Sequence, residues 1–173
     1  MDAAAVGQDE LYAQAAAAYG PVLDRLARGY EADADQRRDL VQDIHVALWR
    51  SFAGFDGRCS TRTWVYRVAH NTATSHILGR KRQARLTGLD DIAELAGPDD
   101  PEAAAGQSHA LSRLTQLIRE LKPIDRQVVL LYLEDLDAAA IGEVTGLSAG
   151  AVAVKIHRLK AILAKQFHDR RPA

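Results

Sequence analysis

The chain has 173 residues, a formal net charge of −1, 47% hydrophobic residues and 26% charged residues, which suits one ordinary water-soluble domain or two small ones. No apolar run approaches the roughly 20 residues of a membrane-spanning helix, and the N-terminus lacks the basic start and apolar core of a signal peptide. The single cysteine, Cys59, excludes an intramolecular disulfide, so we expect a reducing cytoplasmic location without membrane insertion.

The N-terminal part of the chain predicts three helices. The first covers residues 11–30, and Pro21 inside it is expected to kink or restart it because proline lacks a backbone N–H. The second covers residues 36–53 and the third residues 61–83. Apolar residues at helical spacing form the buried stripes of the first two helices: Tyr19, Leu23, Leu26 and Tyr30 in the first, Leu40, Ile44, Ala47 and Leu48 in the second.

The second helix carries a polar set opposite its buried stripe. Asp39, Gln42, Asp43 and Val46 fall at i, i+3, i+4 and i+7, so these four residues share one face. A docking face for a basic partner helix is one interpretation of this acidic set. A plain solvated face is the simpler one, and the spacing alone favours it.

The third helix combines uncharged polar groups with a basic end. Trp64 lies at its start, and Arg67, Asn71 and Thr74 share one face at i, i+4 and i+7. Such a surface suits single-stranded nucleic acid, because rings stack on bases, amides read base edges and cations hold phosphates. Alternatively, Trp64 belongs to the core and the basic end complements the helix dipole. The basic end consists of Arg80, Lys81, Arg82 and Arg85.

Charge divides the chain into three parts. Residues 1–85 hold 12 Lys or Arg against 10 Asp or Glu, a net of +2, and residues 107–173 hold 10 against 7, a net of +3. Residues 86–106 hold six acids and no Lys or Arg, with glycines and prolines that break helices around a short turn expected at Asp90–Leu95. The sequence therefore predicts an all-α protein of two small helical domains, residues 1–85 and 108–173, joined by a flexible acidic linker, residues 86–107.

The C-terminal part has the features of a helix-turn-helix. Helices are expected over Ser108–Leu121 and, with Pro123 in its first turn, over Ile124–Leu133. Beyond them, Asp137 and Ser148 stand where N-caps are needed, and Gly146 where a left-handed C-cap is needed. Two residue pairs have the spacing of a hydrophobic staple: Leu136 with Ile141, and Leu147 with Val152.

The last helix has two faces that differ in chemistry. Ala151, Lys155 and Arg158 fall at i, i+4 and i+7, and small residues followed by cations suit a helix that approaches the major groove of DNA. An ordinary amphipathic helix with solvated lysines would show the same charges. The two capped helices and their turn favour DNA binding. The apolar stripe of this helix consists of Val152, Ile156, Leu159 and Leu163.

Taken in order, these segments resemble a bacterial extracytoplasmic-function sigma factor. Region two is carried by Asp39-Leu40-Val41-Gln42-Asp43, Leu48-Trp49-Arg50, Thr63-Trp64-Val65-Tyr66-Arg67-Val68-Ala69-His70-Asn71 and Arg80-Lys81-Arg82. Region four is carried by Leu121-Lys122-Pro123 through Arg126, by Tyr132-Leu133 and by the helix-turn-helix to Arg158. The resemblance covers most of the chain, apart from its first residues and the linker.

The resemblance implies a transcription initiation factor that binds core RNA polymerase, recognises a promoter and melts its DNA. The polymerase clamp would be bound by Asp39, Gln42, Asp43, Val46 and Trp49. The non-template single strand of the minus-ten element, with a flipped base, would be bound by Arg62, Thr63, Trp64, Arg67, Asn71, Arg80, Lys81 and Arg82. The minus-thirty-five duplex would be bound by Ser148, Ala149, Ala151, Val152, Lys155 and Arg158. The family also implies an anti-sigma factor as a partner.

The helix-turn-helix departs from the family pattern at two places. Ala138–Ala140 stand where many relatives carry an aromatic residue and a glutamate, so the glutamate of a capping box is missing. Ala153 and Val154 stand where relatives often carry a lysine and a small polar residue. Readout of the minus-thirty-five element is therefore expected to depend on Lys155 and Arg158.

Three other functions fit parts of the sequence. A helix-turn-helix repressor or activator explains the C-terminal part but not the order of the region-two segments. An enzyme would need a site at His45 with its acidic neighbours, or at His70 with His76, and neither has a metal spacing such as His-x-x-x-His. A helical adaptor would not need the helix-turn-helix. The sequence therefore predicts no catalytic residue, cofactor or metal.

Overall fold

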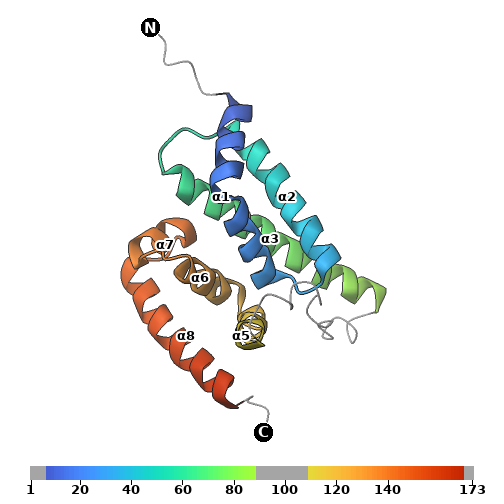
Figure 1. The fold of residues 1–173 in the computed structure, drawn as a ribbon, viewed down its shortest axis with the longest axis vertical. Coiled ribbons are helices and arrows are strands. Elements are labelled where there is room, and N and C mark those ends of the chain that lie inside the picture. Colours follow the sequence, from blue (N-terminus) through green and yellow to red (C-terminus); the bar gives the residue numbers. More distant parts are fainter. Residues whose placement is uncertain (1–6, 89–108, 170–173) are drawn as a thin grey trace.

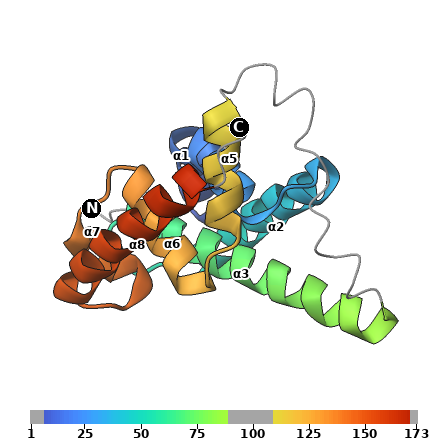
Figure 2. The ribbon, with the colours of Figure 1, turned by 90° about the horizontal axis from the view of Figure 1, so that it is seen from below.

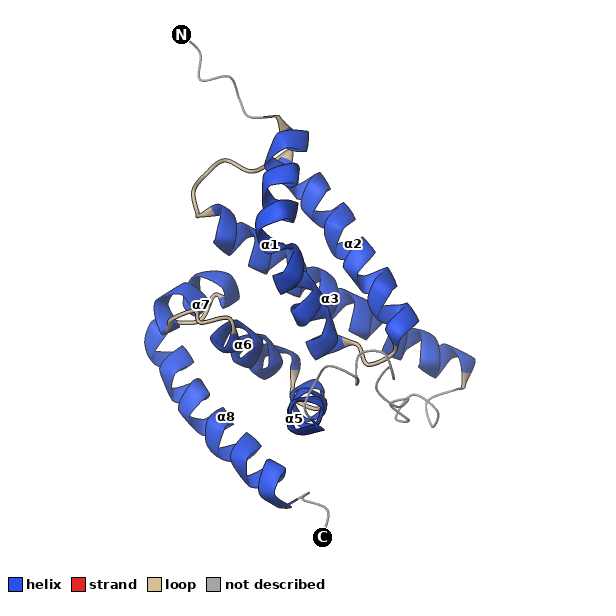
Figure 3. Cartoon of the chain, viewed as in Figure 1, coloured by secondary structure: helices blue, strands red, loops and turns tan. Residues whose placement is uncertain are grey.

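Helices make up all the regular structure in the part of the chain that this computed structural model describes, residues 7–88 and 109–169 (Figure 3). No strand occurs in these ranges, which confirms the all-α prediction. The acidic segment from residue 89 onward and the turn expected at Asp90–Leu95 lie outside the described residues.

Three long helices form the N-terminal bundle: α1 (Gln8–Tyr30), α2 (Ala34–Phe52) and α3 (Thr61–Thr87) (Figure 1). Side-chain oxygens cap two of them, because Asp33 accepts from the Gln36 N–H at 2.8 Å and Ser60 from the Thr63 N–H at 3.1 Å. α1 runs through Pro21 as one helix, so the predicted restart does not occur. Burial of the following turns against α2 and α3 compensates for the backbone hydrogen bond that proline removes.

The core of this bundle follows the predicted stripes. Leu23, Leu40, Ile44 and Leu48 are completely buried, and Leu26 and Tyr30 nearly so. α3 contributes Val65, Ala69 and Ala73, whose small or branched side chains let α1 and α2 pack closely against it. Each fully buried leucine or isoleucine stabilises the bundle by about 1.5–3 kcal/mol relative to an exposed position.

Four shorter or curved helices follow in the C-terminal part: α5 (His109–Arg119), α6 (Pro123–Leu133), α7 (Ala138–Thr145) and α8 (Ala149–Asp169). Pro123 occupies the first turn of α6, as predicted. The turn predictions are also confirmed. Asp137 accepts from the Ala140 N–H at 2.8 Å, Gly146 has φ of 80°, and Ser148 accepts from the Ala151 N–H at 3.1 Å.

α7 and α8 meet at 105°, an angle typical of a helix-turn-helix. In the described ranges, no single helix is both long and apolar enough to cross a membrane. α7 and α8 pass that test only when they are taken together as a bent pair. Their apolar residues Ile141, Val152 and Leu159 are buried inside the protein.

The two halves of the chain pack against each other. α5 and α6 contact α1, and α7 contacts α3, so the buried side chains of both halves form one continuous cluster (Figures 1 and 2). The second half of α3 extends beyond the other helices (Figure 2). The sequence predicted the two sets of helices but not this packing.

A buried polar pair joins α1 to α3 inside the N-terminal bundle. The Tyr30 hydroxyl lies 2.8 Å from Nδ1 of His70, and Nε2 of His70 has no hydrogen-bond partner among the described residues. Burial lowers the pKa of His70 to about 3 and raises the pKa of Tyr30 to about 12. His70 is therefore neutral at pH 7 and acts as a core residue.

Acid should destabilise the fold through His70. Below about pH 6.5, the His70 imidazole of the unfolded chain binds a proton, whereas His70 in the folded protein stays neutral down to about pH 3. We expect the free energy of unfolding to fall by up to about 1.4 kcal/mol per pH unit across this window. Urea unfolding at several pH values should show a shallower slope for His70→Asn than for the wild type. His168→Asn, at an exposed position, should keep the wild-type slope.

Candidate nucleic-acid interface

The outer face of α2 carries all five residues that the resemblance assigns to polymerase binding. Asp39, Gln42 and Asp43 are exposed, and Val46 and Trp49 are each 42% exposed. A solvated helix face does not need two large apolar side chains among acids, whereas a protein-binding face does. Their exposure therefore favours docking over the solvated face that the spacing alone suggested.

Trp49 is held in place by the start of α1. Its indole Nε1–H donates to Oδ1 of Asp9 at 2.8 Å, and Gln8 donates to the Trp49 carbonyl at 2.7 Å. The bond to Asp9 fixes the orientation of the ring, while Trp49 stays partly exposed to solvent. Sequence reasoning did not predict Gln8 and Asp9, because they lie about 40 positions away from Trp49 and on another helix.

The polar residues in the first turns of α3 differ in how deeply they are buried. Arg62 and Asn71 are exposed, Arg67 is half-buried and Thr63 is buried. Trp64 is partly buried, since its Nε1–H donates to the Ser51 hydroxyl at 2.9 Å and its ring centroid lies 5.2 Å from that of Phe55. Its ring thus belongs partly to the core, as the alternative interpretation held, and partly to the surface.

The basic end of α3 lies on the segment that extends beyond the bundle (Figure 2). Arg80, Lys81 and Arg82 are all exposed. Arg80 also forms an ion pair with Glu31, whose side chain is only 6% exposed, in the connection after α1. Glu31 therefore orients one of the three cations. No sequence signal revealed this acid, because Glu31 lies outside every helix.

The start of α8 presents most of the residues predicted to contact duplex DNA. Ser148, Ala149 and Ala151 are exposed, and their small side chains allow a close approach to a groove. Val152 is completely buried, so its side chain lies in the core and away from this surface.

Asp125 of α6 restrains two of the cations of this helix, Lys155 and Arg158. Nζ of Lys155 donates to Oδ1 of Asp125 at 2.6 Å, and Nη2 of Arg158 lies 3.8 Å from the same oxygen. The Asp125 side chain is 13% exposed and that of Lys155 is 20% exposed. The sequence predicted the cations but not the acid that holds them.

α7 covers part of the polar surface of α3. The Thr63 hydroxyl donates to Oε2 of Glu143 at 3.1 Å, and Nη2 of Arg67 donates to the Glu143 carbonyl at 2.6 Å. Two predicted single-strand contacts are therefore already occupied, by a residue of the other half of the chain. Nothing in the sequence indicated this contact, which joins residues 80 positions apart.

The histidines considered as seeds of a catalytic site serve other contacts. His45 lies 3.0 Å from the Tyr12 hydroxyl, and His70 is buried in the core. His76 lies 3.7 Å from both Glu31 and Asp43. Within residues 7–88 and 109–169, no group of three or more His, Cys, Asp or Glu residues could hold a metal ion.

Comparison with known protein families finds two matches in the same order as the two halves. Residues 15–83 match the family model for Sigma-70 region 2, and residues 111–163 match that for Sigma-70, region 4. The first match spans most of α1, α2 and α3, and the second spans the helix-turn-helix.

Individual relatives agree with these family matches. The chain is 30% identical to RNA polymerase sigma factor CnrH of Cupriavidus metallidurans over 174 residues, covering 92% of this chain and 88% of the relative. It is 25% identical to ECF RNA polymerase sigma factor SigW of Bacillus subtilis, covering 94% and 92%. It is 28% identical to ECF RNA polymerase sigma factor SigG of Mycobacterium tuberculosis, but spans only 40% of that relative's length.

Two solved structures share the fold. CnrH in complex with the cytosolic domain of CnrY has a TM-score of 0.66 and 22% identity, with 92% of this chain and 89% of that chain covered. RpoE in complex with the anti-sigma factor NepR from Bartonella quintana has a TM-score of 0.73 and 18% identity, with 92% and 98% covered.

Neutralising Asp125 should release Lys155 and Arg158 of α8. We expect Asp125→Asn to bind random-sequence duplex DNA about three- to tenfold more tightly at low salt, with a steeper salt dependence. The lost ion pair should also lower the free energy of unfolding by about 1–3 kcal/mol. Filter binding across salt concentrations and urea unfolding measure the two effects. Asp169→Asn removes the same charge at an exposed position, and an equal gain there would contradict the role of Asp125.

Proposed function

Because the chain belongs to the extracytoplasmic-function family of RNA polymerase sigma factors, we propose that it is a transcription initiation factor that binds core RNA polymerase and directs promoter recognition and DNA melting. The observation that carries this proposal is the presence of both sigma regions, in order, along a chain similar over nearly its whole length to CnrH. We assign region two to residues 1–85, the linker to 86–107 and region four to 108–173.

Docking on the polymerase is assigned to the exposed face of α2. Asp39, Gln42 and Asp43 offer acceptors to a basic partner helix, and Val46 and Trp49 offer apolar area at its centre. The hydrogen bond that the Trp49 indole donates to Asp9 preorganises the ring, which reduces the conformational entropy lost on binding.

Capture of the minus-ten single strand is assigned to α3. Arg62, Thr63, Trp64, Arg67 and Asn71 would hold the flipped base and its neighbours, because they combine a ring, an amide and hydrogen-bond donors. Extruding a base costs a few kcal/mol, so side chains fixed on a rigid helix favour the melted state. Phosphate contacts are assigned to the basic end of α3: Arg80, Lys81 and Arg82.

Readout of the minus-thirty-five duplex is assigned to the start of α8. Ser148, Ala149 and Ala151 line the approach to the groove, and Lys155 and Arg158 supply the charge. Val152 is assigned an indirect role. Its buried side chain packs α8 against the core and so fixes the position of the helix that contacts DNA.

The family to which the chain belongs consists of transcription factors that are not themselves catalysts, and we assign no catalytic activity to this chain. We place its action in the cytoplasm, where it would meet the polymerase and the promoter. RpoE and CnrH were each solved with a bound protein, NepR in one case and CnrY in the other, and an anti-sigma factor is the corresponding partner proposed here.

The decisive experiment is single-round transcription with purified core polymerase on promoters from the source genome, with and without the chain. Transcripts that appear only with the chain would establish the function, and their start sites would define both promoter elements. Duplex binding without transcripts would instead establish a helix-turn-helix repressor.

Reversing one charge on α2 should weaken docking on the polymerase. The Asp43 side chain is 62% exposed, so Asp43→Arg should leave the fold intact while presenting a cation to a basic partner. We expect affinity for core polymerase to fall about tenfold or more, measured by fluorescence anisotropy. Asp24→Arg, an exposed position on α1, is the matched control, and equal affinities for the two variants would remove the assignment.

Removing one amide from α3 should separate polymerase binding from promoter melting. Asn71 is exposed, so Asn71→Ala should keep the stability of the helix and the affinity for core polymerase. We expect the permanganate reactivity of the melted thymines to fall several-fold, because the lost base contact is worth about 1–3 kcal/mol. Ser75→Ala, one turn further along α3, should behave as the wild type, and wild-type reactivity in Asn71→Ala would exclude a base-reading role.

A further inference from the structure

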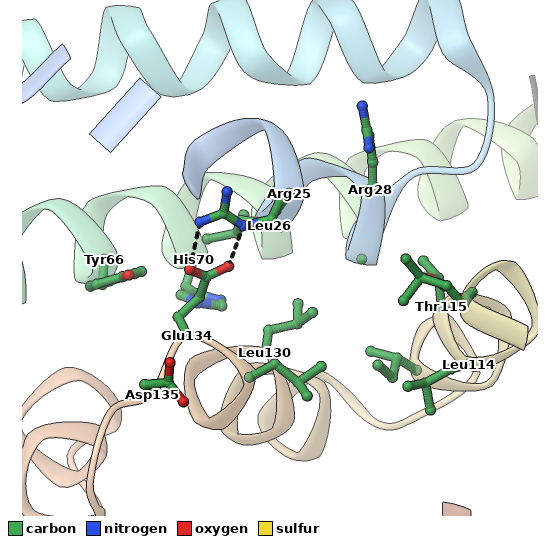
Figure 4. A pocket seen from close by; sticks show the side chains of 14 residues that line it. Arg25, Leu26, Arg28, Tyr66, His70, Leu114, Thr115, Leu130, Glu134 and Asp135 are labelled. Carbon is green, nitrogen blue, oxygen red and sulfur yellow. Dashed lines mark hydrogen bonds and ion pairs between the residues drawn. The ribbon is translucent and has the colours of Figure 1, made fainter. Parts of the chain in front are cut away.

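A cavity of about 610 Å³ lies between residues of α1 and α3 on one side and residues of α5 and α6 on the other (Figure 4). Voids in a well-packed core are seldom larger than a water molecule. This volume instead falls within the range of about 300–1,000 Å³ that is common for small-molecule sites, which often lie between packed domains. None of the described residues assigned to the polymerase or to DNA lines this cavity.

Apolar side chains form most of the cavity wall. Leu26 of α1 is 4% exposed and Ile118 of α5 is 2% exposed, while Leu114 of α5 and Leu130 of α6 are half-buried. Moving the apolar part of a ligand from water to such a wall favours binding, because the hydrophobic effect grows with the apolar area that is buried. The cavity therefore suits a ligand whose body is apolar.

The charged groups of the wall cancel. Among the described residues, the charged side chains that line the cavity are Arg25 and Arg28, with Glu134 and Asp135 of opposite sign. Nε and Nη2 of Arg25 donate to the two carboxylate oxygens of Glu134, each at 2.8 Å, so these two residues neutralise each other (Figure 4). Because the wall has no net charge, it attracts neither an anion nor a cation, and an uncharged ligand fits it best.

The Tyr66 hydroxyl is a donor without an acceptor at this wall. Tyr66 is 3% exposed, and its hydroxyl makes no hydrogen bond within residues 7–88 and 109–169. Burial, with the Glu134 carboxylate as the second cause, raises the pKa of Tyr66 to about 12, so the hydroxyl keeps its proton at pH 7. A buried O–H group needs an acceptor, and a ligand oxygen in the cavity would supply one.

His70 supplies a second donor at the same wall. The Thr74 hydroxyl donates to the Tyr30 oxygen, because this bond acts against the rise in the Tyr30 pKa that burial causes. The Tyr30 O–H is thus left to donate to Nδ1 of His70, and the proton of the neutral imidazole lies on Nε2. Nε2 has no hydrogen-bond partner among the described residues, and His70 lines the cavity together with Tyr66.

We propose that this cavity binds an uncharged, largely apolar small molecule that carries a carbonyl oxygen, as an amide, ester, lactone or ketone does. The apolar body lies among the leucines and Ile118 of the wall, and the carbonyl oxygen accepts from the Tyr66 hydroxyl and from Nε2–H of His70. The site goes beyond the proposed function, since polymerase docking and DNA binding are assigned to other residues.

Nile red tests the site on the full chain, because this dye is uncharged, apolar and carries a carbonyl oxygen. We expect its emission to shift to shorter wavelengths and to rise as the dye enters an apolar cavity. The titration should saturate at a single dye molecule per chain. Absence of saturable binding would overturn the proposal.

Removing the Tyr66 hydroxyl tests the contact with the carbonyl oxygen. Tyr66→Phe keeps the ring and its packing, and we expect it to weaken Nile red binding about three- to tenfold. Pyrene, a flat apolar dye without a polar atom, should bind this variant and the wild type equally well. Tyr132→Phe, outside the cavity, is the matched control. Unchanged Nile red affinity in Tyr66→Phe, or an equal loss of both dyes, would overturn carbonyl recognition.

Filling the cavity tests the location of the bound dye. Thr115 lines the cavity, whereas Gln116, the next residue of α5, is exposed and does not. We expect Thr115→Trp to weaken binding of both dyes at least about tenfold, because the indole takes the space of the ligand. Gln116→Trp should bind them as the wild type does. Urea unfolding reports whether each variant is folded.

A second apolar groove makes the location test decisive. This groove lies between α5, α6 and α8 and is lined by Val129, Tyr132 and Leu163, but not by Thr115. Wild-type dye binding by folded Thr115→Trp would place the dyes outside the proposed cavity and overturn the proposal. If Thr115→Trp does not fold, the comparison of Nile red with pyrene in Tyr66→Phe decides.

Discussion

The structure depends on α3 serving two surfaces at once. Along one side of this 27-residue helix, Val65, Ala69 and Ala73 are fully buried against α1 and α2. Along the other side lie polar residues from Arg62 to Asn71, of which Thr63 and Arg67 contact Glu143 of α7. Because both sets lie on one rigid helix, the packing of the core determines the positions of the groups that face DNA.

The buried pair of Tyr30 and His70 shows the same coupling. It fixes α1 against α3 inside the N-terminal bundle, and Arg126 of α6 packs over the Tyr30 ring. The hydrogen bond between them is directional, so this pair orients the helices more strictly than apolar contacts would. The position of region four is thus connected to the core of region two through one aromatic ring.

Glu31, Asp125 and Glu143 each hold a cation that is assigned to nucleic acid. Glu31 pairs with Arg80, Asp125 with Lys155 and Arg158, and the Glu143 carbonyl accepts from Arg67. Such pairs lower the attraction to random DNA and preorganise the cations. The six acids of residues 86–106 balance the positive charge of the two flanking parts, so a chain with a net charge of −1 can still present basic surfaces.

Local features of the sequence were enough to predict the helices, their buried stripes and the helix-turn-helix. Asp137 and Ser148 mark helix starts by capping nearby N–H groups, and such signals need no distant contact. Helical spacing was also enough to place the proposed binding residues of α2 and of α3 on one face of each helix, although their roles in binding stay predictions. Of the two outcomes expected at Pro21, a kink or a restart, the restart does not occur, because burial of neighbouring turns outweighs one missing hydrogen bond. The tertiary structure alone decided that Val152 lies inside, that Asp125 and Glu31 hold cations, and that Glu143 covers Thr63. These contacts join residues 30, 49 and 80 positions apart, and such pairs form only when the packing of whole helices brings them together.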